Sequence, residues 1–553
     1  MTTESLVTTP IDHETERQND LSKVLNSVHK KRVVVAGPGT GKSFLFERVI
    51  RKEKKEGKSK FLALTFMGKL CDELADDLAG LAETRTIHSF ARKFVIDLLG
   101  EGWIYFPQIY DVIAYDLSLQ GLRDVSIDSK EYLARSNYYK AIGDKDAIHY
   151  ALKLGEKFPE KIPSDYDLIL VDEYQDLNET EDKFIDLLAT KNNILIVGDD
   201  DQALYDFKGS FSKFIREKYK ATGEEYLSTT LRFCSRCTDV IINAFHRIAN
   251  AYGLNNLGNE RIKKEYLCYT PGKKEDNEAN PSIILLQNVV PADIANKIIH
   301  QLSELLERQK IKSVLVIGEA RTCKYLLPVI AEQLRYKGFK HVDNPKLTDD
   351  VYKLKTNIIE GLKLLKKSPL STLAWRLMIE SLDEETRKSL ILISLDEKQN
   401  FINSIPEDFK KTSEKIATTH NGLTKKSKSE RTKIANSSIA SLEGLISSSR
   451  LDYREILTNQ LREETNHLPR PLANLEIAVT SILLSKGLGA DVVFLIGFDQ
   501  GKLPTTSAPD ESEIYQMLVA LTRTKKRLYL INTKDKPTSC FINSIGKDNY
   551  EVI

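Results

Sequence analysis

The sequence predicts an α/β protein whose core is built from buried parallel strands that end in polar loops. Val33–Ala36, Leu168–Val171 and Ile194–Val197 are short apolar runs, as expected of strands that helices cover on both faces. A glycine-rich or acidic loop follows each run directly. The chain has 553 residues, of which 41% are hydrophobic. That length corresponds to roughly three to four domains, and the composition supports a packed core.

Composition excludes several classes of protein. The 80 basic and 79 acidic residues give a net charge of +1, which excludes binding of nucleic acid through bulk charge but leaves room for a narrow binding channel. Six cysteines exclude a disulfide framework. The longest apolar runs, such as Val492–Phe498, are far shorter than the roughly 18 residues of a membrane span. Residues 1–20 lack the apolar core of a signal peptide, so we expect a cytoplasmic protein that makes no membrane contact.

A glycine-rich loop stands between the first run and a helical pattern that extends from Phe44 to Arg51. Backbone amides in such a loop converge on phosphate oxygens, and the helix N-terminus adds partial positive charge. Lys42 is predicted to reach the β- and γ-phosphates of a nucleotide, and Ser43 to hold Mg²⁺. The alternative is an ordinary strand–helix turn, because the strict pattern has glycine where Ala36 stands. The loop consists of Gly37, Pro38, Gly39, Thr40, Gly41, Lys42 and Ser43.

Polar side chains follow the second and third runs. Asp172 and Glu173 end the second run, and the stretch from Gly198 to Gln202 ends the third. Carboxylates at the end of a core strand are costly unless they meet a cation or take part in chemistry. We expect Asp172 to bind Mg²⁺ together with Ser43, Glu173 to polarise an attacking water, and Gln202 to sense the γ-phosphate. Taken singly, each cluster is also compatible with a solvated loop.

The order of these motifs resembles superfamily 1A (SF1A) DNA helicases of the UvrD/Rep type, in a compact variant. The third motif is the most specific to that family. The resemblance implies two RecA-like P-loop NTPase domains with parallel sheets, each carrying a mainly helical insertion. The matching stretches, from motif I to motif VI with Ia and Ib included, are Ala36–Ser43, Leu64–Lys69, Thr86–Phe90, Asp172–Asp176, Gly198–Gly209, Thr230–Phe233, Ser485–Leu488 and Ala520–Lys525.

The resemblance also gives expected domain boundaries. Residues 1–93 and 165–222 form the first RecA-like domain (1A), and residues 94–164 its insertion (1B). Residues 223–345 and 470–553 form the second (2A), and residues 346–469 its insertion (2B). A basic cluster between Lys425 and Lys433 is either a solvated surface or a contact to duplex phosphates. Both insertions look smaller than is usual in the family, and the chain ends soon after motif VI. We therefore expect a compact motor, for which a separate nuclease or a repair or defence protein is a possible partner.

In this family ATP lies between the two RecA-like domains, so the resemblance assigns a set of nucleotide contacts. Arg232 and Arg523 would reach the γ-phosphate from the second domain, Gln18 would read the base, and Gly487 would line the site. Three positions depart from the family pattern: Leu231 replaces an aromatic residue, Leu483 a histidine and Gly489 a glutamate. The expected catalytic residues are Lys42, Asp172, Glu173, Gln202, Arg232 and Arg523.

Aromatic side chains in loops beyond the strand ends predict a path for single-stranded DNA. Base–aromatic stacking is worth about 1–3 kcal/mol per base and tolerates any sequence, so a protein with little net charge can still hold a single strand. The alternative for each aromatic is a place in the core. The expected nucleic-acid contacts are Thr65, Phe66, His88, Tyr205, Phe207 and Lys208.

Three functions remain open at this stage. The first is an ATP- and Mg²⁺-dependent helicase that moves 3′ to 5′ on single-stranded DNA and unwinds forked or duplex DNA in repair, recombination or defence; the direction rests on the resemblance alone. The second is a DNA-stimulated ATPase that remodels nucleoprotein or serves a nuclease partner. The third is a non-hydrolysing scaffold. Separately, Cys234 and Cys237 form a C-x-x-C pattern with Cys268 downstream, which we interpret as coincidence rather than a metal site.

Overall fold

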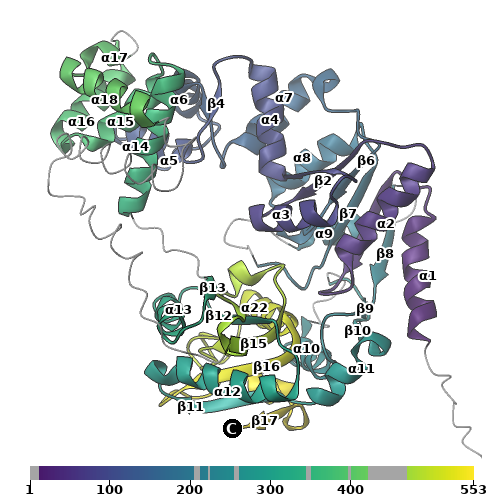
Figure 1. Cartoon of the computed structure of the whole chain (residues 1–553). Helices are drawn as coiled ribbons and strands as arrows, with labels where there is room; N and C mark the ends of the chain where they lie inside the picture. Colours follow the sequence, from purple (N-terminus) through teal and green to yellow (C-terminus); the bar gives the residue numbers. More distant parts are fainter. Residues whose placement is uncertain are drawn as a thin grey trace, which may run out of the picture. The chain divides into compact units, whose positions relative to one another are not determined.

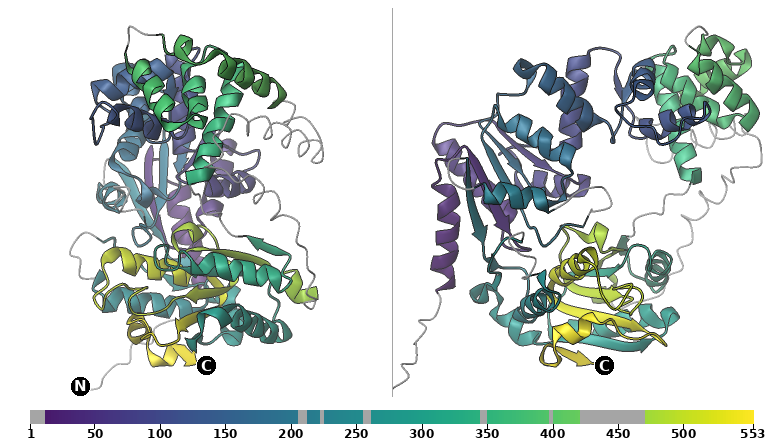
Figure 2. Two further views of the ribbon diagram at one scale, coloured as in Figure 1. Left: turned by 90° about the vertical axis from the view of Figure 1, so that its left-hand side faces the viewer. Right: turned by 180° about the vertical axis from the view of Figure 1, so that it is seen from behind.

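The computed structural model describes residues 12–204, 212–221, 225–254, 261–343, 350–396, 400–420 and 470–553. The chain divides into two compact units, whose elements are labelled in Figure 1 and seen from two further sides in Figure 2. Unit 1 comprises Met1–Ser89, Gly155–Pro345 and Glu464–Ile553, and unit 2 comprises Phe90–Leu154 and Lys346–Glu463. No helix in the described part of the chain is long and apolar enough to cross a membrane.

The first sheet of unit 1 has six strands in the order β3-β2-β6-β7-β1-β8, and every pair is parallel. The three apolar runs singled out in the sequence are β1, β6 and β7, and all but one of their residues are completely buried. Because the strands are parallel, the loops after β1, β6 and β7 meet at one edge. The strands are β1 (Lys31–Ala36), β2 (Phe61–Thr65), β3 (Glu83–Thr86), β6 (Leu168–Val171), β7 (Ile194–Gly198) and β8 (Tyr226–Leu231).

Helices with one apolar face cover this sheet. In α2 the residues Leu45, Phe46, Val49 and Ile50 recur at helical spacing and pack against the core side chains of the sheet. Helix α8 begins with a capping box between Asn178 and Glu181. The helices are α1 (His13–Leu25), α2 (Lys42–Lys55), α3 (Gly68–Asp77), α4 (Ile87–Leu99), α7 (Ala147–Lys157), η1 (Pro159–Lys161), η2 (Tyr174–Asp176), α8 (Glu179–Ala189) and α9 (Lys213–Lys220).

Strand β8 lies beyond the expected end of the first RecA-like domain at residue 222. It pairs in parallel with β1 from Lys31↔Tyr226 to Ala36↔Leu231, so it belongs to the first sheet. The chain therefore leaves the first sheet after Leu231, because the strand register continues to that residue.

The second sheet of unit 1 has seven parallel strands in the order β13-β14-β12-β15-β16-β11-β17. Hydrophobic clusters fill both of its faces, as a parallel sheet requires. Its strands are β11 (Ile283–Val289), β12 (Ser313–Gly318), β13 (His341–Asp343), β14 (Glu476–Ser481), β15 (Ala490–Ile496), β16 (Thr524–Thr533) and β17 (Tyr550–Val552). A small parallel pair, β9 (Phe233–Cys234) and β10 (Leu267–Cys268), stands apart from it. The fold is thus α/β with two parallel sheets, as predicted.

The helices that accompany the second sheet follow the same principle of one buried face. In α22 a capping box joins Asp510 and Glu513 at the first turn. They are α10 (Asp239–Ala251), α11 (Thr270–Ala279), η5 (Pro291–Asp293), α12 (Ile294–Arg308), α13 (Leu326–Tyr336), α21 (Arg470–Ala473), η8 (Leu483–Ser485), α22 (Glu511–Thr522), α23 (Phe541–Ile545) and η9 (Lys547–Asn549).

Unit 2 is mainly helical and combines the two expected insertions in one body. Leu373 and Leu377 from the second insertion share a core cluster with Ile109 and Tyr132 from the first. The basic cluster between Lys425 and Lys433 lies outside the described residues. The elements of unit 2 are β4 (Ile104–Tyr105), α5 (Ile109–Ser118), α6 (Lys130–Tyr139), β5 (Ala141–Ile142), α14 (Asp350–Lys367), α15 (Thr372–Met378), η6 (Ile379–Ser381), α16 (Glu384–Leu395), α17 (Phe401–Ser404) and α18 (Glu407–His420).

A buried ion pair joins the two insertions. The Arg376 guanidinium donates from Nε and Nη2 to Asp116 Oδ1 at 2.8 and 2.7 Å, and the Tyr139 hydroxyl donates to Asp116 Oδ2 at 2.6 Å. Asp116 and Arg376 are 0% and 1% exposed. Removal of one buried partner leaves the other charge without compensation.

We therefore expect Asp116→Ala to destabilise unit 2 by about 3–5 kcal/mol, since Arg376 would remain buried and unpaired. Hydrogen exchange of the α5 and α15 amides measures this change. Asp111→Ala is the matched control, because Asp111 pairs with Lys145 at the surface of the same helix, where such a pair contributes about 0.5 kcal/mol or less. Equal exchange in the two variants would contradict the prediction.

Candidate active site

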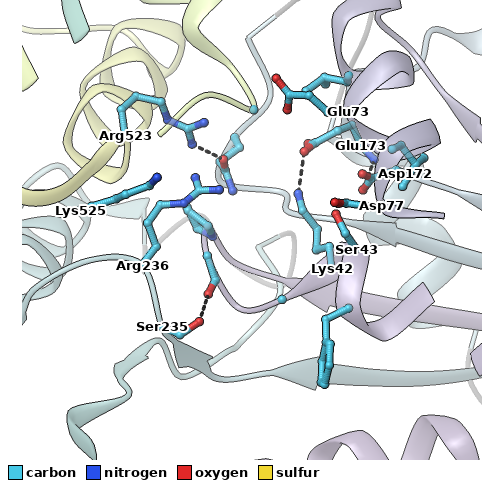
Figure 3. A pocket seen from close by; sticks show the side chains of 18 of the residues that line it. Lys42, Ser43, Glu73, Asp77, Asp172, Glu173, Ser235, Arg236, Arg523 and Lys525 are labelled. Carbon is cyan, nitrogen blue, oxygen red and sulfur yellow. Dashed lines mark hydrogen bonds and ion pairs between the residues drawn. The ribbon is translucent and has the colours of Figure 1, made fainter. Parts of the chain in front are cut away.

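The two sheets of unit 1 together form a pocket of about 430 Å³. The loops after β1, β6 and β7 provide one wall, and the residues just before β15 and β16 provide the other. Figure 3 shows Lys42, Asp172 and Glu173 facing Arg523, Arg236 and Lys525. The volume lies within the range of small-molecule sites. The predicted site residues in the lining are Pro38, Gly39, Gly41, Lys42, Ser43, Asp172, Glu173, Gln202, Gly487 and Arg523.

The glycine-rich loop is shaped to bring backbone close to a ligand. Gly39 and Gly41 have φ of +70° and +92°, a conformation that residues with side chains rarely adopt. Gly37 O accepts bonds from the Thr40 amide at 3.3 Å and the Thr40 hydroxyl at 2.8 Å, which close the loop. Helix α2 then begins at Lys42, and no side chain caps its first turn. The amide donors at this helix N-terminus are therefore suited to an anion.

Lys42 and Glu173 form a buried ion pair on this wall. Lys42 Nζ donates to Glu173 Oε1 at 2.7 Å (Figure 3), and Glu173 itself has a φ of +53° at the end of β6. Burial alone would lower the pKa of Lys42, but Glu173 and Asp172 raise it. Burial alone would raise the pKa of Glu173, but Lys42 and Lys486 hold it below its ordinary value. Both groups are therefore charged at neutral pH.

Asp172 and Ser43 offer a suitable set of ligands for Mg²⁺. Both line the pocket, and their oxygens are the donor type that Mg²⁺ prefers. Asp172 Oδ1 accepts a bond from the Glu173 amide at 2.9 Å, and burial raises the pKa of Asp172 to about 6. A divalent cation would stabilise the ionised carboxylate, so the residues fit the ion.

Lys486 is a functional candidate that the sequence reasoning missed as a residue, although it stands inside the stretch quoted for motif V. Its ammonium is 1% exposed, bonds Asp176 and donates to Gln202 O at 2.6 Å. It also lies 3.7 Å from Glu173 Oε2. Burial raises the pKa of Asp176 to about 6, and Lys486 opposes that rise. Lys486 therefore connects motifs II, III and V by one buried charge.

Arg523 presents a buried positive charge to the pocket. It is 1% exposed, and its guanidinium donates to the neutral oxygens Val519 O at 3.0 Å, Leu488 O at 3.1 Å and Gln202 Oε1 at 3.2 Å. Burial, with the neighbouring Arg236, lowers the pKa of Arg523 to about 10. These hydrogen-bond partners carry no compensating charge, so an anion in the pocket would stabilise the guanidinium. A triphosphate has the chemistry to do so.

The structure corrects the position of the motif IV arginine. Arg232 follows β8 directly and lies toward α1, where it pairs with Asp20 at 2.8 Å and Glu16 at 3.0 Å. It is absent from the lining of the 430 Å³ pocket, whereas Arg236 is present there. The physical reason is the turn after β9, in which the Ser235 amide and hydroxyl donate to Gly39 O at 2.9 and 3.1 Å. That turn carries Arg236, and not Arg232, to the phosphate loop.

We expect Arg236→Ala to reduce ATP hydrolysis about a hundredfold, because the guanidinium faces the phosphate side of the pocket. Arg232→Ala should change the maximal rate less than about threefold, since Arg232 is neutralised by carboxylates outside the pocket. Steady-state kinetics of the two purified variants tests the difference. A stronger loss in Arg232→Ala than in Arg236→Ala would restore the original assignment.

A second pocket of about 100 Å³ adjoins the phosphate loop at Thr40, Gly41 and Phe44. Gln18, Leu231 and Arg232 also line it. Gln18 Nε2 donates to Glu14 at 2.7 Å, and Gln18 Oε1 accepts from Arg48 at 3.4 Å. The geometry thus brings Gln18 and Leu231 to one side of the loop, where a base could lie.

The two departures in motif V also lie near the larger pocket or its core. At Gly489 a Cβ would stand 3.3 Å from Arg236 Nε and 3.4 Å from Lys525 Cε. Only a very small side chain therefore fits beside these two cations. Leu483 packs against the hydrophobic cluster on one face of the second sheet.

The expected nucleic-acid contacts are only partly described by the structure. Thr65 ends β2 and is 1% exposed, and its hydroxyl has no hydrogen-bond partner. The rings of Phe66 and His88 meet edge to face at 6.1 Å, and His88 lies 3.5 Å from Glu181. Phe66 and His88 are therefore brought together. Tyr205, Phe207 and Lys208 lie outside the described residues.

Within the described residues, three or more possible metal ligands converge only at Asp199, Asp200 and Asp201. Lys264, Arg261 and Arg216 already neutralise these carboxylates. Cys234, Cys237 and Cys268 do not form such a group. The cysteine pattern therefore builds no metal site in this part of the chain.

Comparisons with known proteins agree with this geometry. An AAA domain family matches residues 22–208, and the UvrD-like helicase C-terminal domain family matches residues 149–535. Probable DNA helicase II homologs of Rickettsia felis and Mycoplasma genitalium are 23% and 24% identical; the matches cover 91% and 94% of this chain and 90% and 86% of theirs. The exonuclease/helicase subunit RexA of Lactococcus lactis is 31% identical over 30% of this chain, and the match spans only 14% of that relative. The second family model covers most of the chain, and the chain therefore belongs to the UvrD-like helicase family.

Proposed function

We propose that this chain hydrolyses ATP, with Mg²⁺, to move along single-stranded DNA and separate duplex strands. One observation carries the proposal: a single pocket joins the Lys42–Glu173 pair of the first sheet to Arg236 and Arg523 at the second sheet. Charge on a γ-phosphate would attract both walls at once, and its loss on hydrolysis would release that attraction. Such a cycle converts nucleotide turnover into relative movement of the two sheets.

Each side chain has a proposed role in this cycle. The phosphate loop and Lys42 bind the β- and γ-phosphates, while Ser43 and Asp172 hold Mg²⁺, which neutralises developing charge. Glu173 accepts a hydrogen bond from the attacking water. Gln202, Arg236 and Arg523 stabilise charge on the transferred phosphoryl group. Gln18 lies on the side expected for the base.

The nucleic-acid track is proposed to pass over Thr65, Phe66 and His88. Stacking on aromatic rings tolerates every base, as a translocating motor requires. By family resemblance the movement is 3′ to 5′, and the substrates are single-stranded and forked DNA. We place this activity in the cytoplasm, in repair, recombination or defence.

A second candidate is a DNA-stimulated ATPase that serves a separate nuclease. It is favoured by the match to RexA of Lactococcus lactis and by a match to an ATP-dependent helicase/nuclease of Streptococcus sanguinis, which is 27% identical over 40% of this chain. In both matches this chain spans less than a fifth of the relative, 14% and 18%. We therefore consider a nuclease partner for this motor.

The test is the rate of ATP hydrolysis with and without single-stranded DNA, for the full chain and Lys42→Ala. We expect DNA to stimulate hydrolysis, and Lys42→Ala to lower the rate about a thousandfold because the phosphates lose their bound cation. Lys52→Ala, in the same helix but outside the pocket lining, is the matched control. Equal rates in the wild type and Lys42→Ala would overturn the proposal.

A forked duplex with a labelled strand separates the two candidates. Displacement of the strand supports the helicase. DNA-stimulated hydrolysis without displacement supports the second candidate, and displacement that returns when a co-purified nuclease is added identifies the partner's contribution.

A further inference from the structure

Three consecutive aspartates follow β7 and are all buried. Asp199, Asp200 and Asp201 are each 0% exposed. Lys264 Nζ contacts all three carboxylates, at 2.5 Å for Asp200 and 3.0 Å for Asp201. The Lys264 side chain is only 5% exposed. One ammonium thus sits at the centre of a buried acidic turn.

Two arginines complete the neutralisation of this turn. Arg261 pairs in a bidentate manner with Asp201, at 2.8 and 2.7 Å, and Arg216 Nε donates to Asp200 at 2.9 Å. Three negative charges therefore meet three positive ones. Because cations of the protein itself occupy the cluster, its purpose is to fix the turn rather than to bind a metal.

The turn continues directly into the pocket. Asp199 Oδ2 accepts a hydrogen bond from Gln202 Nε2 at 2.6 Å, which orients the amide of Gln202. The opposite side of the amide, Oε1, accepts from Arg523 Nη2 at 3.2 Å. A continuous chain of contacts therefore runs from Lys264 through Asp199 and Gln202 to Arg523.

The segment that carries Lys264 also supports the phosphate loop. Tyr266 donates from its hydroxyl to Pro38 O at 2.7 Å, and a Cβ on Gly37 would stand 2.8 Å from the Tyr266 ring. Residues 261–266 thus hold two loops that line the same pocket. A shift of this segment would move both loops together.

We propose that Lys264 is a positioning residue for ATP hydrolysis: by pairing with Asp199 it fixes the Gln202 amide in the orientation that accepts from Arg523. The inference rests on the proposed function and deepens it. Loss of the lysine leaves Asp199 without its ammonium partner, and the amide is then free to rotate away from Arg523. Catalytic geometry is sensitive to such shifts, because a displacement of about 1 Å can cost a hundredfold in rate.

The experiment compares steady-state ATP hydrolysis and nucleotide binding in Lys264→Met, Lys264→Arg and the exposed neighbour Lys263→Met. We expect Lys264→Met to lower kcat about tenfold to a hundredfold while KM for ATP changes less than about threefold. Lys264→Arg, which retains a donor, should recover part of kcat, and Lys263→Met should match the wild type.

Two double variants separate positioning from stability. Lys264→Met/Asp200→Asn restores the charge balance of the buried turn, so its melting temperature should recover while kcat stays low. Lys264→Met/Gln202→Ala should be no slower than Gln202→Ala alone, since both changes break one contact chain. Recovery of kcat together with the melting temperature, or multiplication of the two rate losses, would overturn the inference.

The same experiment distinguishes this inference from the proposed function. If the wild type and Lys42→Ala hydrolyse ATP equally slowly, the proposed function fails and the inference fails with it. If the wild type is active and Lys264→Met retains its full kcat, the inference alone fails.

Discussion

Arg523→Ala should lower the rate of ATP hydrolysis about a thousandfold or more, because an arginine that reaches a γ-phosphate across an interface contributes 10³–10⁵ in rate. Its guanidinium is buried and bonds neutral oxygens, so the charge is available to a phosphate. Nucleotide binding should weaken much less than the rate, since Lys42 and the phosphate loop remain. Single-turnover hydrolysis, together with binding of a fluorescent ATP analogue, measures the two effects separately.

Arg527→Ala provides the matched control for Arg523→Ala. Arg527 lies on the adjoining strand β16, outside the pocket lining, and bonds Asn280 and Ala279 O. We expect its hydrolysis rate to stay within about threefold of the wild type, because the residue contacts no part of the pocket. A comparable loss in both variants would mean that the strand's stability, and not the guanidinium at the pocket, governs the rate.

The parts of the site that the sequence could predict are those formed by neighbouring residues. The loop from Gly37 to Ser43 determines its own backbone, through glycine at positive φ and a helix that starts directly afterwards. Asp172 and Glu173 follow a buried strand, so the parallel sheet alone brings them to the edge where that loop ends. Such features need only local sequence and the rule that parallel strands share one orientation.

Other residues depend on register and turns that no local pattern encodes. Arg232 and Arg236 both stand near the end of β8, and only the bond of Ser235 to Gly39 O determines which of them reaches the pocket. The expected domain boundary at residue 222 is too early for the same reason, because the pairing of β8 with β1 continues to Leu231. Both errors concern where a strand stops.

Residues joined over long sequence separations were also beyond the sequence. Lys264 meets Asp199 only in the folded chain, and its own neighbourhood gives no signal that the lysine is buried. Arg376 and Asp116 belong to different insertions and pair across 260 positions. The expectation of two separate helical insertions followed from their separation in sequence, whereas packing places them in one unit.

Glu173→Gln should lower the rate of ATP hydrolysis about 10²- to 10⁴-fold, the usual contribution of a general base. Lys42 and Lys486 keep the pKa of Glu173 below its ordinary value, so the carboxylate is ionised and able to accept a hydrogen bond from water. Glutamine preserves the shape and the contact with Gln175, which donates to Glu173 Oε2 at 2.6 Å, only if its amide presents oxygen there. In either orientation it is a far weaker base.

Because glutamine leaves the phosphate loop and both arginines in place, Glu173→Gln should bind ATP at least as tightly as the wild type. Glu179→Gln, on the exposed first turn of α8, is the control and should hydrolyse ATP at the wild-type rate. The decisive measurement is the burst of product in a single turnover, which chemistry limits in Glu173→Gln. An unchanged burst rate would show that another group, such as Asp172, activates the water, and the pocket would then need a different assignment of base and metal ligand.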